Sequence, residues 1–589
     1  MTISEKLSAL RANMKARGID AYIVPSGDPH QSEYMADHWK SREWISGFTG
    51  SAGTVIVTAG HAGLWTDSRY FIQAAEQLKG SGIELHKLKI PHTAQHRDWL
   101  KGHLPEGSKI GFDGRVFSVG KVRSLAKFFY GKKFVFDTET DLIGGIWKDR
   151  PPLPKEPVFE LPVKYAGLNR KAKLKQVRAK MDGASHYLIS TLDDIAWLFN
   201  LRGRDVECNP VFYAYAVVGE KKVWLFTETK KVSGKLKKKL NNDGIIIKPY
   251  KSLQGFLQKL PQSASILVDK NSTSNRVFNA IKKERIRDGK NIVRALKAIK
   301  NKKETGHIRE VMAKDGAALV KLFRWLESTL EKRPVPECEV AEKLIAFRRA
   351  QGNYFGESFP AIVGYQANGA IVHYHAEPAT CASIEKKGIL LLDSGGQYLD
   401  GTTDITRTIA LGRPTGEQKK DFTLVLKGHI ALAMAKFPAG TTGVQLDTLA
   451  RMNLWQQQMN YGHGTGHGVG FFLNVHEPPQ GISPRSSVAL QPGMLTSNEP
   501  GLYKAGKYGI RTENLVLCAE DGEEGEFGKF LRFETVTLFP IDLSLIAKNM
   551  LSKEEKNWLN AYHEEVFEKL SPRLDRAEKA WLKGKCGRV

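Results

Sequence analysis

Two aspartates in the C-terminal half stand where a carboxylate is costly to bury. Asp393 ends the apolar run GILLLD, and Asp404 follows eleven positions later in GTTDITRT. A carboxylate at the end of an apolar strand needs a cation or a cluster of hydrogen-bond donors. Gly395 and Gly396 lie between the two, so we expect two strands to fold back and bring the carboxylates together. Taken alone, the pair is equally compatible with aspartates that cap a helix or a turn.

Three histidines follow within the segment HGTGHGVGFFLNVHE, at His463, His467 and His476. The glycines between and after the first two permit an irregular backbone that lets side chains and ligands approach closely. A lone histidine is usually structural, but imidazole is also a common metal ligand and proton carrier. We therefore expect a glycine-rich loop that carries functional histidines and leads into an apolar strand.

Two glutamates complete the set, Glu499 in LTSNEPG and Glu513 in GIRTENLVL. Each alone would be expected at a solvated strand edge. Four carboxylates and one imidazole at the strand ends of one domain are a different case, because four negative charges in a dry pocket either raise some pKa values or bind cations. Two divalent metals would balance the charge. A ligand set rich in oxygen, with one nitrogen and no sulfur, suits manganese, cobalt or zinc.

Five motifs carry a resemblance to a known family: LLLDSGGQYLDGTTDITRT, HGTGHGVG, VHE, NEPG and GIRTEN. They closely resemble the Xaa-Pro aminopeptidase (aminopeptidase P) branch of the pita-bread metallopeptidases, in its long three-domain form. PSGDPHQSEY, SGFTGSAGT, WTDSRYF and LDDIAWLFNLRG are similar to the two creatinase-like N-terminal domains of that family. The resemblance implies an enzyme that releases the N-terminal residue from peptides with proline in the second position.

The resemblance also implies a role for each site residue. Asp393 would bind one metal, Asp404 and Glu513 would bridge both, and His467 and Glu499 would complete the second. Glu499 would also move the proton of the attacking water. The substrate-site residues that the resemblance implies are His373 in IVHYHA, His463, His476 and, from the first domain, Arg69. The expected cofactor is a pair of divalent ions, manganese before cobalt or zinc.

The elements that must position these residues fall into three expected domains. Residues 1–155 and 156–293 each alternate helical and strand patterns, which predicts two α/β creatinase-like domains whose similar order hints at duplication. The proline-rich stretch 149–162 predicts a linker. Residues 294–589 begin with long helices and continue with strands, which favours an α+β pita-bread catalytic domain around an antiparallel sheet. One helical stretch, 416–436, separates its strands, and a helical tail follows residue 552.

The composition predicts a folded, several-domain protein: the chain has 589 residues, of which 41% are hydrophobic and 9% aromatic. No apolar run approaches the roughly 18 residues of a membrane span, and the first residues lack the apolar core of a secretory signal. We therefore expect a cytoplasmic protein without a membrane partner.

The cysteines are far apart, which predicts thiols rather than a disulfide framework. They are Cys208, Cys338, Cys381, Cys518 and Cys586.

The formal net charge of +25 raises the possibility of an anionic partner. The lysines concentrate in segments 221–239 and 300–304, where we expect solvated helix ends and loops. The sequence has no RNA-binding signature, no Cys2His2 spacing and no alternating aromatic and basic stripe. The prediction is a basic surface without a nucleic-acid function.

Three other activities and one other class compete with the aminopeptidase. Prolidase has the same ligands but prefers dipeptides, methionine aminopeptidase lacks the two preceding domains, and creatinase works without metals. A catalytically inactive binding protein on this scaffold would use the basic surface instead. The intact ligand set argues against creatinase and against an inactive binding protein. The long three-domain pattern and the HGTGHGVG motif favour the aminopeptidase over prolidase. The apolar elements of the catalytic domain and the family pattern predict a homodimer through that domain.

Overall fold

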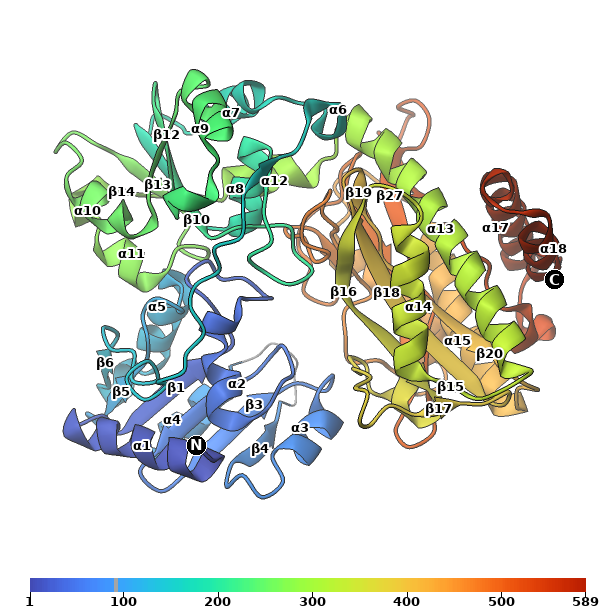
Figure 1. Cartoon of the computed structure of the whole chain (residues 1–589), viewed down its shortest axis with the longest axis horizontal. Coiled ribbons are helices and arrows are strands. Elements are labelled where there is room, and N and C mark those ends of the chain that lie inside the picture. Colours follow the sequence, from blue (N-terminus) through green and yellow to red (C-terminus); the bar gives the residue numbers. More distant parts are fainter. Residues whose placement is uncertain (89–93) are drawn as a thin grey trace. The chain divides into compact units, whose positions relative to one another are not determined.

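Two compact units make up the chain in the computed structural model, which describes residues 1–88 and 94–589 (Figure 1). The first unit comprises Met1–Pro162 and Leu168–Val293, and the second comprises Val163–Gly167 and Arg294–Val589. The first unit contains two mixed six-stranded sheets, and the second contains antiparallel sheets with long helices. The expected combination of α/β and α+β architecture is confirmed.

The first sheet has the order β4-β3-β2-β1-β5-β6. Its centre is antiparallel, and β4, β5 and β6 join it in parallel. Alternate residues of β1 enter two different cores: Tyr22 packs in one with Leu10, and Ile23 packs in the other with Leu100. Both faces of this sheet are therefore covered. The strands are β1 (Ala21–Pro25), β2 (Thr54–Thr58), β3 (Ala62–Thr66), β4 (Glu84–Lys87), β5 (Lys109–Gly111) and β6 (Val135–Asp137). The helices are α1 (Ile3–Ala16), α2 (Ser41–Ser46), α3 (Phe71–Gln77), α4 (His96–His103) and α5 (Val119–Phe128).

The second sheet repeats this plan in the order β12-β11-β10-β8-β13-β14, with the same sequence of parallel and antiparallel pairs. The similar order of elements noted in the sequence thus corresponds to two sheets of one topology. The strands are β8 (His186–Ile189), β10 (Ala214–Gly219), β11 (Val223–Thr227), β12 (Ile245–Pro249), β13 (Ile266–Val268) and β14 (Ile286–Asp288), and β7 (Phe159–Glu160) pairs with β9 (Leu201–Arg202) beside them. The helices are α7 (Arg170–Arg178), α8 (Leu192–Phe199), α9 (Gly234–Asn242), α10 (Leu253–Gln258) and α11 (Asn275–Asn279).

The second unit is built on two antiparallel sheets. In the first, the long strand β18 pairs with β16, β19 and β20, and the second has the order β21-β28-β27-β24. Their strands are β16 (Tyr354–Tyr365), β18 (Ile389–Tyr398), β19 (Gly401–Thr402), β20 (Ile405–Ala410), β21 (Lys436–Pro438), β24 (Leu495–Asn498), β27 (Asn514–Glu520) and β28 (Phe530–Thr535). Three two-stranded antiparallel sheets add β15 (Val335–Pro336) with β17 (Ser383–Ile384), β22 (Gly466–His467) with β23 (Gly481–Ile482), and β25 (Gly501–Lys504) with β26 (Tyr508–Arg511).

Helices cover these sheets (Figure 1), and one large apolar core lies between the helices and the first of the two sheets, while the second sheet packs in a separate core. The core includes Leu322 of α13, Val363 of β16, Leu392 of β18 and Val425 of α15. The helices are α6 (Val163–Ala166), α12 (Ile292–Ala298), α13 (Lys302–Leu330), α14 (Glu337–Arg349), α15 (Gly416–Ala433), α16 (Gly443–Trp455), α17 (Lys553–Leu570) and α18 (Arg576–Lys585). In the described part of the chain no helix has the length and apolar character needed to cross a bilayer.

Several expectations about single elements are wrong. Asp393 lies inside β18 rather than at a strand end, because the strand continues to Tyr398 before it turns back. The apolar residues after His467 form a buried irregular segment instead of a strand. A second helix, α16, follows the one expected between the strands. Lys231 and Lys300 are buried instead of solvated, because they pair with the buried carboxylates of Asp205 and Glu477.

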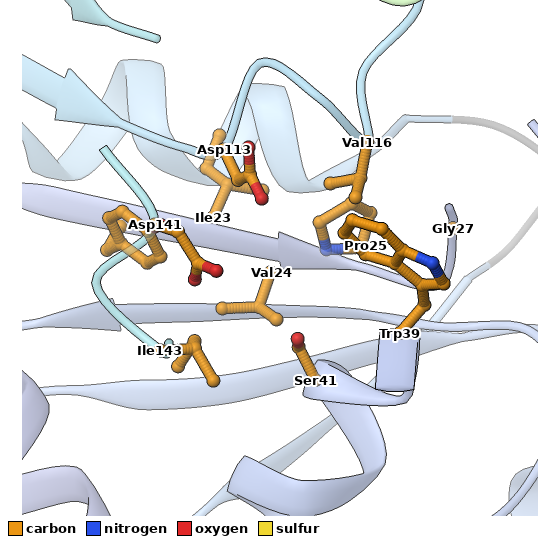
Figure 2. Close-up of a pocket in the computed structure, with 11 residues that line it drawn as sticks. Ile23, Val24, Pro25, Gly27, Trp39, Ser41, Asp113, Val116, Asp141 and Ile143 are labelled. Atoms are coloured by element: carbon orange, nitrogen blue, oxygen red, sulfur yellow. The ribbon is translucent and has the colours of Figure 1, made fainter. Parts of the chain in front are cut away.

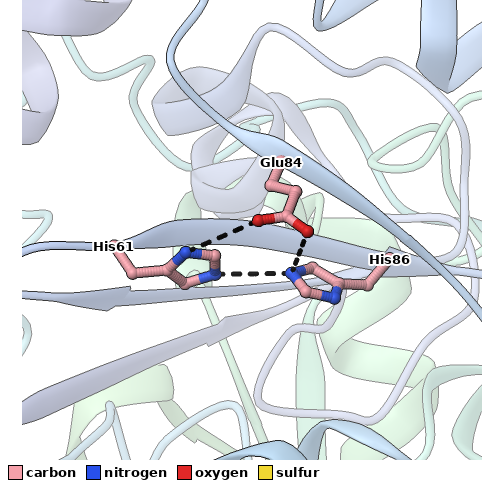
Figure 3. A group of neighbouring side chains, drawn as sticks. All are labelled: His61, Glu84 and His86. Atoms are coloured by element: carbon pink, nitrogen blue, oxygen red, sulfur yellow. Dashed lines mark hydrogen bonds and ion pairs between the residues drawn. The ribbon is translucent and has the colours of Figure 1, made fainter.

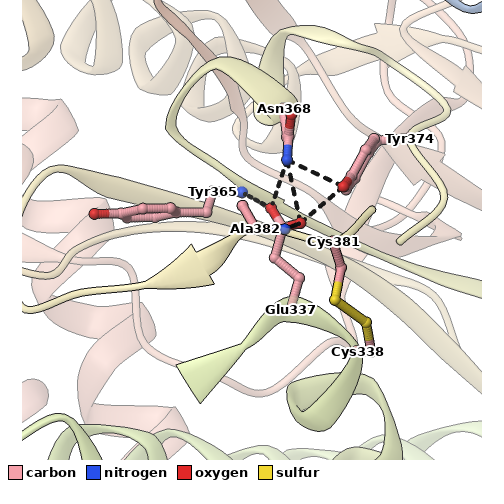
Figure 4. Close-up of a disulfide and its surroundings, with 7 residues drawn as sticks. All are labelled: Glu337, Cys338, Tyr365, Asn368, Tyr374, Cys381 and Ala382. Atoms are coloured by element: carbon pink, nitrogen blue, oxygen red, sulfur yellow. Dashed lines mark hydrogen bonds between the residues drawn. A yellow bond between two sulfur atoms is a disulfide. The ribbon is translucent and has the colours of Figure 1, made fainter. Parts of the chain in front are cut away.

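The prediction that all five cysteines are thiols is also wrong, because Cys338 and Cys381 form a disulfide (Figure 4). The cause is local pairing: Pro336 of β15 lies opposite Ser383 of β17, and this brings the two cysteines together with their Cα atoms 6.4 Å apart. Beside the disulfide, the buried Glu337 carboxylate accepts hydrogen bonds from four groups. They are the backbone N–H of Tyr365 and Ala382, the Asn368 amide and the Tyr374 hydroxyl.

A small cavity lies in the first domain beside β1 (Figure 2). Its volume is about 20 Å³, which is close to the space that one water molecule needs. Asp113 and Asp141 contribute its acidic groups. Arg115 pairs with both carboxylates at 2.7 and 2.5 Å, and Arg150 pairs with Asp141 at 2.7 Å. The cavity is therefore a charge-balanced packing defect, too small for an organic substrate.

Candidate active site

Asp393 is held between two partner strands. It pairs with Ile362 of β16 on one side and with Thr406 of β20 on the other. Its Oδ2 accepts a hydrogen bond from Nη2 of Arg511 at 2.5 Å. Its Oδ1 is buried and has no hydrogen-bond partner among the described residues. Since a buried carboxylate oxygen without a donor is costly, this oxygen has the environment of a metal ligand.

Asp404, His467 and Glu513 each bring one ligand atom to within 4.8 Å of the other two. Three separate elements place them: Asp404 directly precedes β20, His467 ends β22, and Glu513 directly precedes β27. Nε2 of His467 lies 3.4 Å from Oδ2 of Asp404 and 3.4 Å from Oε1 of Glu499. Residues separated by more than 100 positions therefore converge at one point.

Hydroxyl groups orient the two glutamates of this cluster. Thr406 donates its hydroxyl hydrogen to Oε2 of Glu513 at 2.7 Å. Ser497 donates to Oε1 of Glu499 at 3.2 Å and accepts the backbone N–H of His467 at 2.9 Å. The backbone N–H of Glu499 itself donates to the carbonyl of Thr465. The carboxylates are thus fixed by their own strands and by neighbouring side chains.

The charges of the cluster interact strongly. Burial, followed by the charges of Asp404, Glu499 and Asp393, raises the pKa of Glu513 well above its usual range. Burial likewise raises the pKa of Asp393, and it raises the pKa of Glu499 to about 7. Burial lowers the pKa of His467, but the hydrogen bond with Asp404 and the charge of Glu499 outweigh it and bring the value to about 9. Burial and the neighbouring charges therefore disfavour the ionised forms of Asp393, Glu499 and Glu513.

The donor set fits a pair of divalent cations. It offers four carboxylates and one imidazole, with no sulfur ligand, and one of its carboxylate oxygens is buried without a donor. Such a set suits the harder divalent ions, for which oxygen ligands are preferred. Burial, together with mutual repulsion, raises the pKa values of Asp393, Glu499 and Glu513, and bound cations would offset the repulsion.

A second layer of polar groups adjoins the carboxylates. Nη1 of Arg511 donates to the Tyr503 hydroxyl at 2.5 Å, and that oxygen also lies 2.8 Å from Nε2 of His463. Nδ1 of His463 is 3.9 Å from Oε2 of Glu499. His463 is therefore part of one polar network with Glu499 and Arg511.

The other two expected substrate-site histidines lie nearby. The ring of His476 meets the ring of His467 edge to face, with centroids 4.3 Å apart. His373 is half-buried, and the carbonyl of the preceding Val372 lies 3.5 Å from Nη2 of Arg511. The second histidine of the HYH motif, His375, is exposed. The second unit thus brings together Asp393, Asp404, His467, Glu499, Glu513, His463 and His476, with His373 on an adjoining loop.

Family models match the chain nearly from end to end. Two models described as Creatinase/Prolidase N-terminal domain match residues 6–140 and 149–304. Metallopeptidase family M24 matches residues 306–520, and the C-terminal region of peptidase_M24 matches residues 529–589. The probable Xaa-Pro aminopeptidase P of Laccaria bicolor is 42% identical over 99% of this chain and 93% of that protein. The chain belongs to the Xaa-Pro aminopeptidase P branch of metallopeptidase family M24.

Other members of the M24 family support this placement. Aminopeptidase P2 of Arabidopsis thaliana is 40% identical over 99% of this chain and 88% of that protein. The crystal structure of X-prolyl aminopeptidase from Caenorhabditis elegans, described as a cytosolic enzyme with a di-nuclear active site, superposes with a TM-score of 0.96. It is 35% identical and each chain is covered completely. The expected creatinase-like domains and pita-bread domain are confirmed.

Arg69 is the substrate-site residue that we expected from the first domain. It lies in the first unit. Its guanidinium forms a bidentate pair with Asp67, with both N–O distances 2.8 Å. It also lies over the ring of Tyr70. Although burial acts in the opposite direction, the hydrogen bonds and charge of Asp67 raise the pKa of Arg69. The residue is therefore a fixed cation whose orientation is set within its own domain.

Sequence reasoning missed three polar residues of the site: Arg511, Tyr503 and Thr406. Arg511 lies two positions before Glu513 in the same GIRTEN motif, where it stands as a cation among expected anions. That contrast was the available signal. Thr406 faces Asp393 across the sheet, and Tyr503 lies in a hairpin opposite Gly509, so only the strand register reveals their positions.

Proposed function

We propose that the chain is a dimetal aminopeptidase that releases the N-terminal residue from peptides with proline in the second position. The observation that carries this proposal is the buried cluster of four interacting carboxylates with His467. It occurs in a chain that matches named Xaa-Pro aminopeptidases over nearly its whole length. As a metallo-exopeptidase it is a hydrolase of the M24 family.

In this proposal the five residues divide between two ions as the family resemblance implies. Asp393 would hold one ion, His467 and Glu499 would hold the other, and Asp404 and Glu513 would be shared between them. Manganese is the first expectation from the oxygen-rich ligand set, with cobalt or zinc as alternatives. Such ions, when bound, polarise a carbonyl group and make water a stronger nucleophile at neutral pH.

The chain's own residues position the peptide and move the protons. Glu499 accepts the proton of the attacking water and passes it to the leaving proline nitrogen. Its carboxylate is held for this by the Ser497 hydroxyl. His463 and His476 face the same region, and with His373 they donate to the peptide carbonyl and to the developing oxyanion.

Proline changes what the site has to recognise. Its peptide nitrogen carries no hydrogen, so recognition relies on the shape of the ring and on carbonyl groups. We assign Arg69 to the peptide beyond the proline, because a guanidinium binds both carboxylates and carbonyl oxygens. Its pairing with Asp67 supports a directed role for this cation.

One substrate comparison tests this function against the prolidase alternative. The peptide Arg-Pro-Pro-Gly-Phe is expected to lose its first residue with a higher kcat/KM than the dipeptide Arg-Pro. Replacing the second-position proline with alanine should cut the rate severely, because the ring contacts are lost. Arg69→Ala should weaken turnover of longer peptides most. A clearly higher kcat/KM for the dipeptide would establish prolidase activity instead.

The remaining parts of the proposal concern organisation. We propose domains at residues 1–155, 156–293 and 294–589, and a homodimer formed through the third, since two-fold dimers are the commonest oligomers. A cytoplasmic location agrees with the description of the Caenorhabditis elegans relative. Nucleic acid is not proposed as a partner, and retention on heparin or DNA at about 0.2 M salt would contradict this. Light scattering at micromolar concentration tests the dimer.

A further inference from the structure

A second group of potential ligands lies at the edge of the first sheet, in the first unit (Figure 3). His61 directly precedes β3, while Glu84 and His86 lie on β4, which is the edge strand. Gly63 pairs with Glu84 and Trp65 pairs with His86 across the parallel ladder. Because side chains alternate along a strand, this register places Glu84 and His86 on one face, two residues apart.

The distances among the three side chains are those of ligands around one point. Nε2 of His61 lies 3.4 Å from Nε2 of His86. Glu84 reaches both rings, with one carboxylate oxygen 3.7 Å from Nε2 of His86 and the other 3.8 Å from Nδ1 of His61. One ligand atom of each residue lies within 4.8 Å of the others. Two imidazole nitrogens on one tetrahedral zinc ion are about 3.3 Å apart, so the histidines already have the required separation.

The surroundings hold the two rings in this orientation. Trp65 stacks on His86 with centroids 4.0 Å apart, and Trp99 stacks on His61 at 4.5 Å. A Cβ atom at Gly63 would lie 2.7 Å from Nε2 of His61 and 2.8 Å from the His86 ring, so a side chain there would displace both. The rings are thus fixed by stacking and by the space that glycine leaves, and their nitrogens face each other.

The protonation state agrees with ligand chemistry. Burial lowers the pKa of both His61 and His86, which leaves neutral imidazoles near pH 7. Neutral imidazole is the form that binds metals. The Glu84 side chain is 65% exposed, and its negative charge raises the pKa of both histidines. The nearby His103 and Arg11 lower the pKa of His61.

The geometry points to a third metal site, in which His61, Glu84 and His86 bind one zinc-type divalent ion, with solvent in the remaining position. Two imidazoles and one carboxylate form a nitrogen-rich set, whereas the cluster around Glu513 is rich in oxygen. Imidazole ligands favour zinc over manganese. The ion would tie the start of β3 to the edge strand β4, and it would be independent of peptide hydrolysis.

Zinc binding by the full-length, manganese-loaded protein tests this proposal. Equilibrium dialysis against micromolar zinc, followed by metal analysis, should show about one zinc ion per chain fewer in His61→Ala and His86→Ala than in the wild type. Glu84→Gln should weaken zinc binding by about tenfold or more, since it removes a charged ligand from an exposed position where folding is not at risk. Zinc should raise the melting temperature of the wild type more than that of these variants.

The matched control is His186→Ala, which removes a half-buried imidazole that stacks on Trp224 in the second sheet. It should bind as much zinc as the wild type. All variants should retain wild-type turnover of an Xaa-Pro peptide, because none contributes to the catalytic cluster. Equal zinc content in the wild type, Glu84→Gln and His86→Ala would overturn the proposal. Loss of zinc together with loss of turnover would show that the ion belongs to the catalytic site instead.

Discussion

Arg511 joins Asp393 to Tyr503: one guanidinium nitrogen donates to the carboxylate and another to the phenol, both at 2.5 Å. The same phenol oxygen contacts His463. A single planar cation therefore connects a carboxylate of the cluster with a histidine expected to bind the substrate. The planar guanidinium has separate nitrogens in a fixed geometry, so it donates to both groups at once. A lysine ammonium has a single nitrogen and cannot reproduce this arrangement.

Arg511→Lys should therefore lower kcat/KM by about 10- to 100-fold, the range observed when groups behind metal ligands are lost. The charge is kept, but one of the two contacts is lost, so Asp393 and His463 are no longer held together. Steady-state kinetics and metal analysis measure the effect. Arg532→Lys, on the exposed face of β28, is the matched control and should behave like the wild type. Full activity of Arg511→Lys would show that the guanidinium geometry is not needed.

Glu513→Gln should abolish peptide turnover while the protein stays folded. The amide removes one charge from the shared cluster, and Thr406 can still donate to the remaining oxygen. Metal analysis should show a lower metal content, and circular dichroism should be unchanged. Glu520→Gln, at the exposed end of β27, provides the control. Chelation should likewise remove activity, and manganese or cobalt should restore it. Wild-type rates in a protein verified to be free of metal would contradict the dimetal mechanism.

Glu477→Gln should destabilise the protein by about 3–5 kcal/mol, the usual cost of leaving a buried charge without its partner. The Glu477 carboxylate pairs with Lys297 at 3.1 Å and with Lys300 at 2.6 Å, and all three side chains are almost fully buried. Thermal unfolding measures the loss. Adding Lys300→Met should recover part of it, because one buried ammonium is then removed. A melting temperature equal to that of the wild type would show that the ammonium groups find other partners.

The stability of the protein should fall as the pH drops from about 6.5 towards 4, partly through His563. Burial lowers the pKa of His563 to about 4, and Nε2 accepts the backbone N–H of Ile541 at 3.0 Å. In this window the unfolded chain binds a proton that the folded chain does not, so acid favours unfolding by about 1.4 kcal/mol per pH unit for one such group. His563→Gln keeps an acceptor but does not titrate, so its melting temperature should depend less steeply on pH. Parallel curves for both proteins would contradict this.

Reduction of the Cys338–Cys381 disulfide should lower the melting temperature. The bond closes a loop with a sequence separation of 43, for which chain entropy predicts a contribution of about 4 kcal/mol. Cys338→Ser should equal the reduced wild type and should not respond to reductant. Cys208→Ser, which does not affect this disulfide, should respond as the wild type does. Identical melting of oxidised and reduced wild type would rule out the expected stabilisation.

The sequence allowed the candidate cluster to be predicted because its members stand out locally. Asp404, Glu499 and Glu513 are acids beside apolar strand segments, and His467 lies among glycines. The fold name and the proline specificity followed from the family resemblance, not from periodicity. Asp393 was placed at a strand end because the apolar run stops there, but the strand continues through glycines that pack closely: a Cβ at Gly395 would lie 2.0 Å from the carbonyl oxygen of Thr403.

The features that could not be predicted depend on contacts distant in sequence. Nothing near Cys338 or Cys381 indicates a partner, since the pairing of β15 with β17 brings them together. Lys300 lies in a run of charged residues that is typical of a solvated helix start, yet its ammonium meets Glu477 from a segment 177 positions away. Burial of this kind is set by tertiary packing, which outweighs local polarity.

The two sheets of the first unit also provide a comparison within one molecule. They have the same strand order, so β11 and β12 are the counterparts of β3 and β4. The pairs between β11 and β12 run from Val223 with Ile245 to Thr227 with Pro249, and β12 itself reads IIIKP, without histidine or carboxylate. Two sheets of one topology therefore carry different side chains at the same edge, isoleucines in one and imidazole with carboxylate in the other. This plan of strands tolerates either chemistry there, so the edge can carry a property in one domain that the other domain lacks.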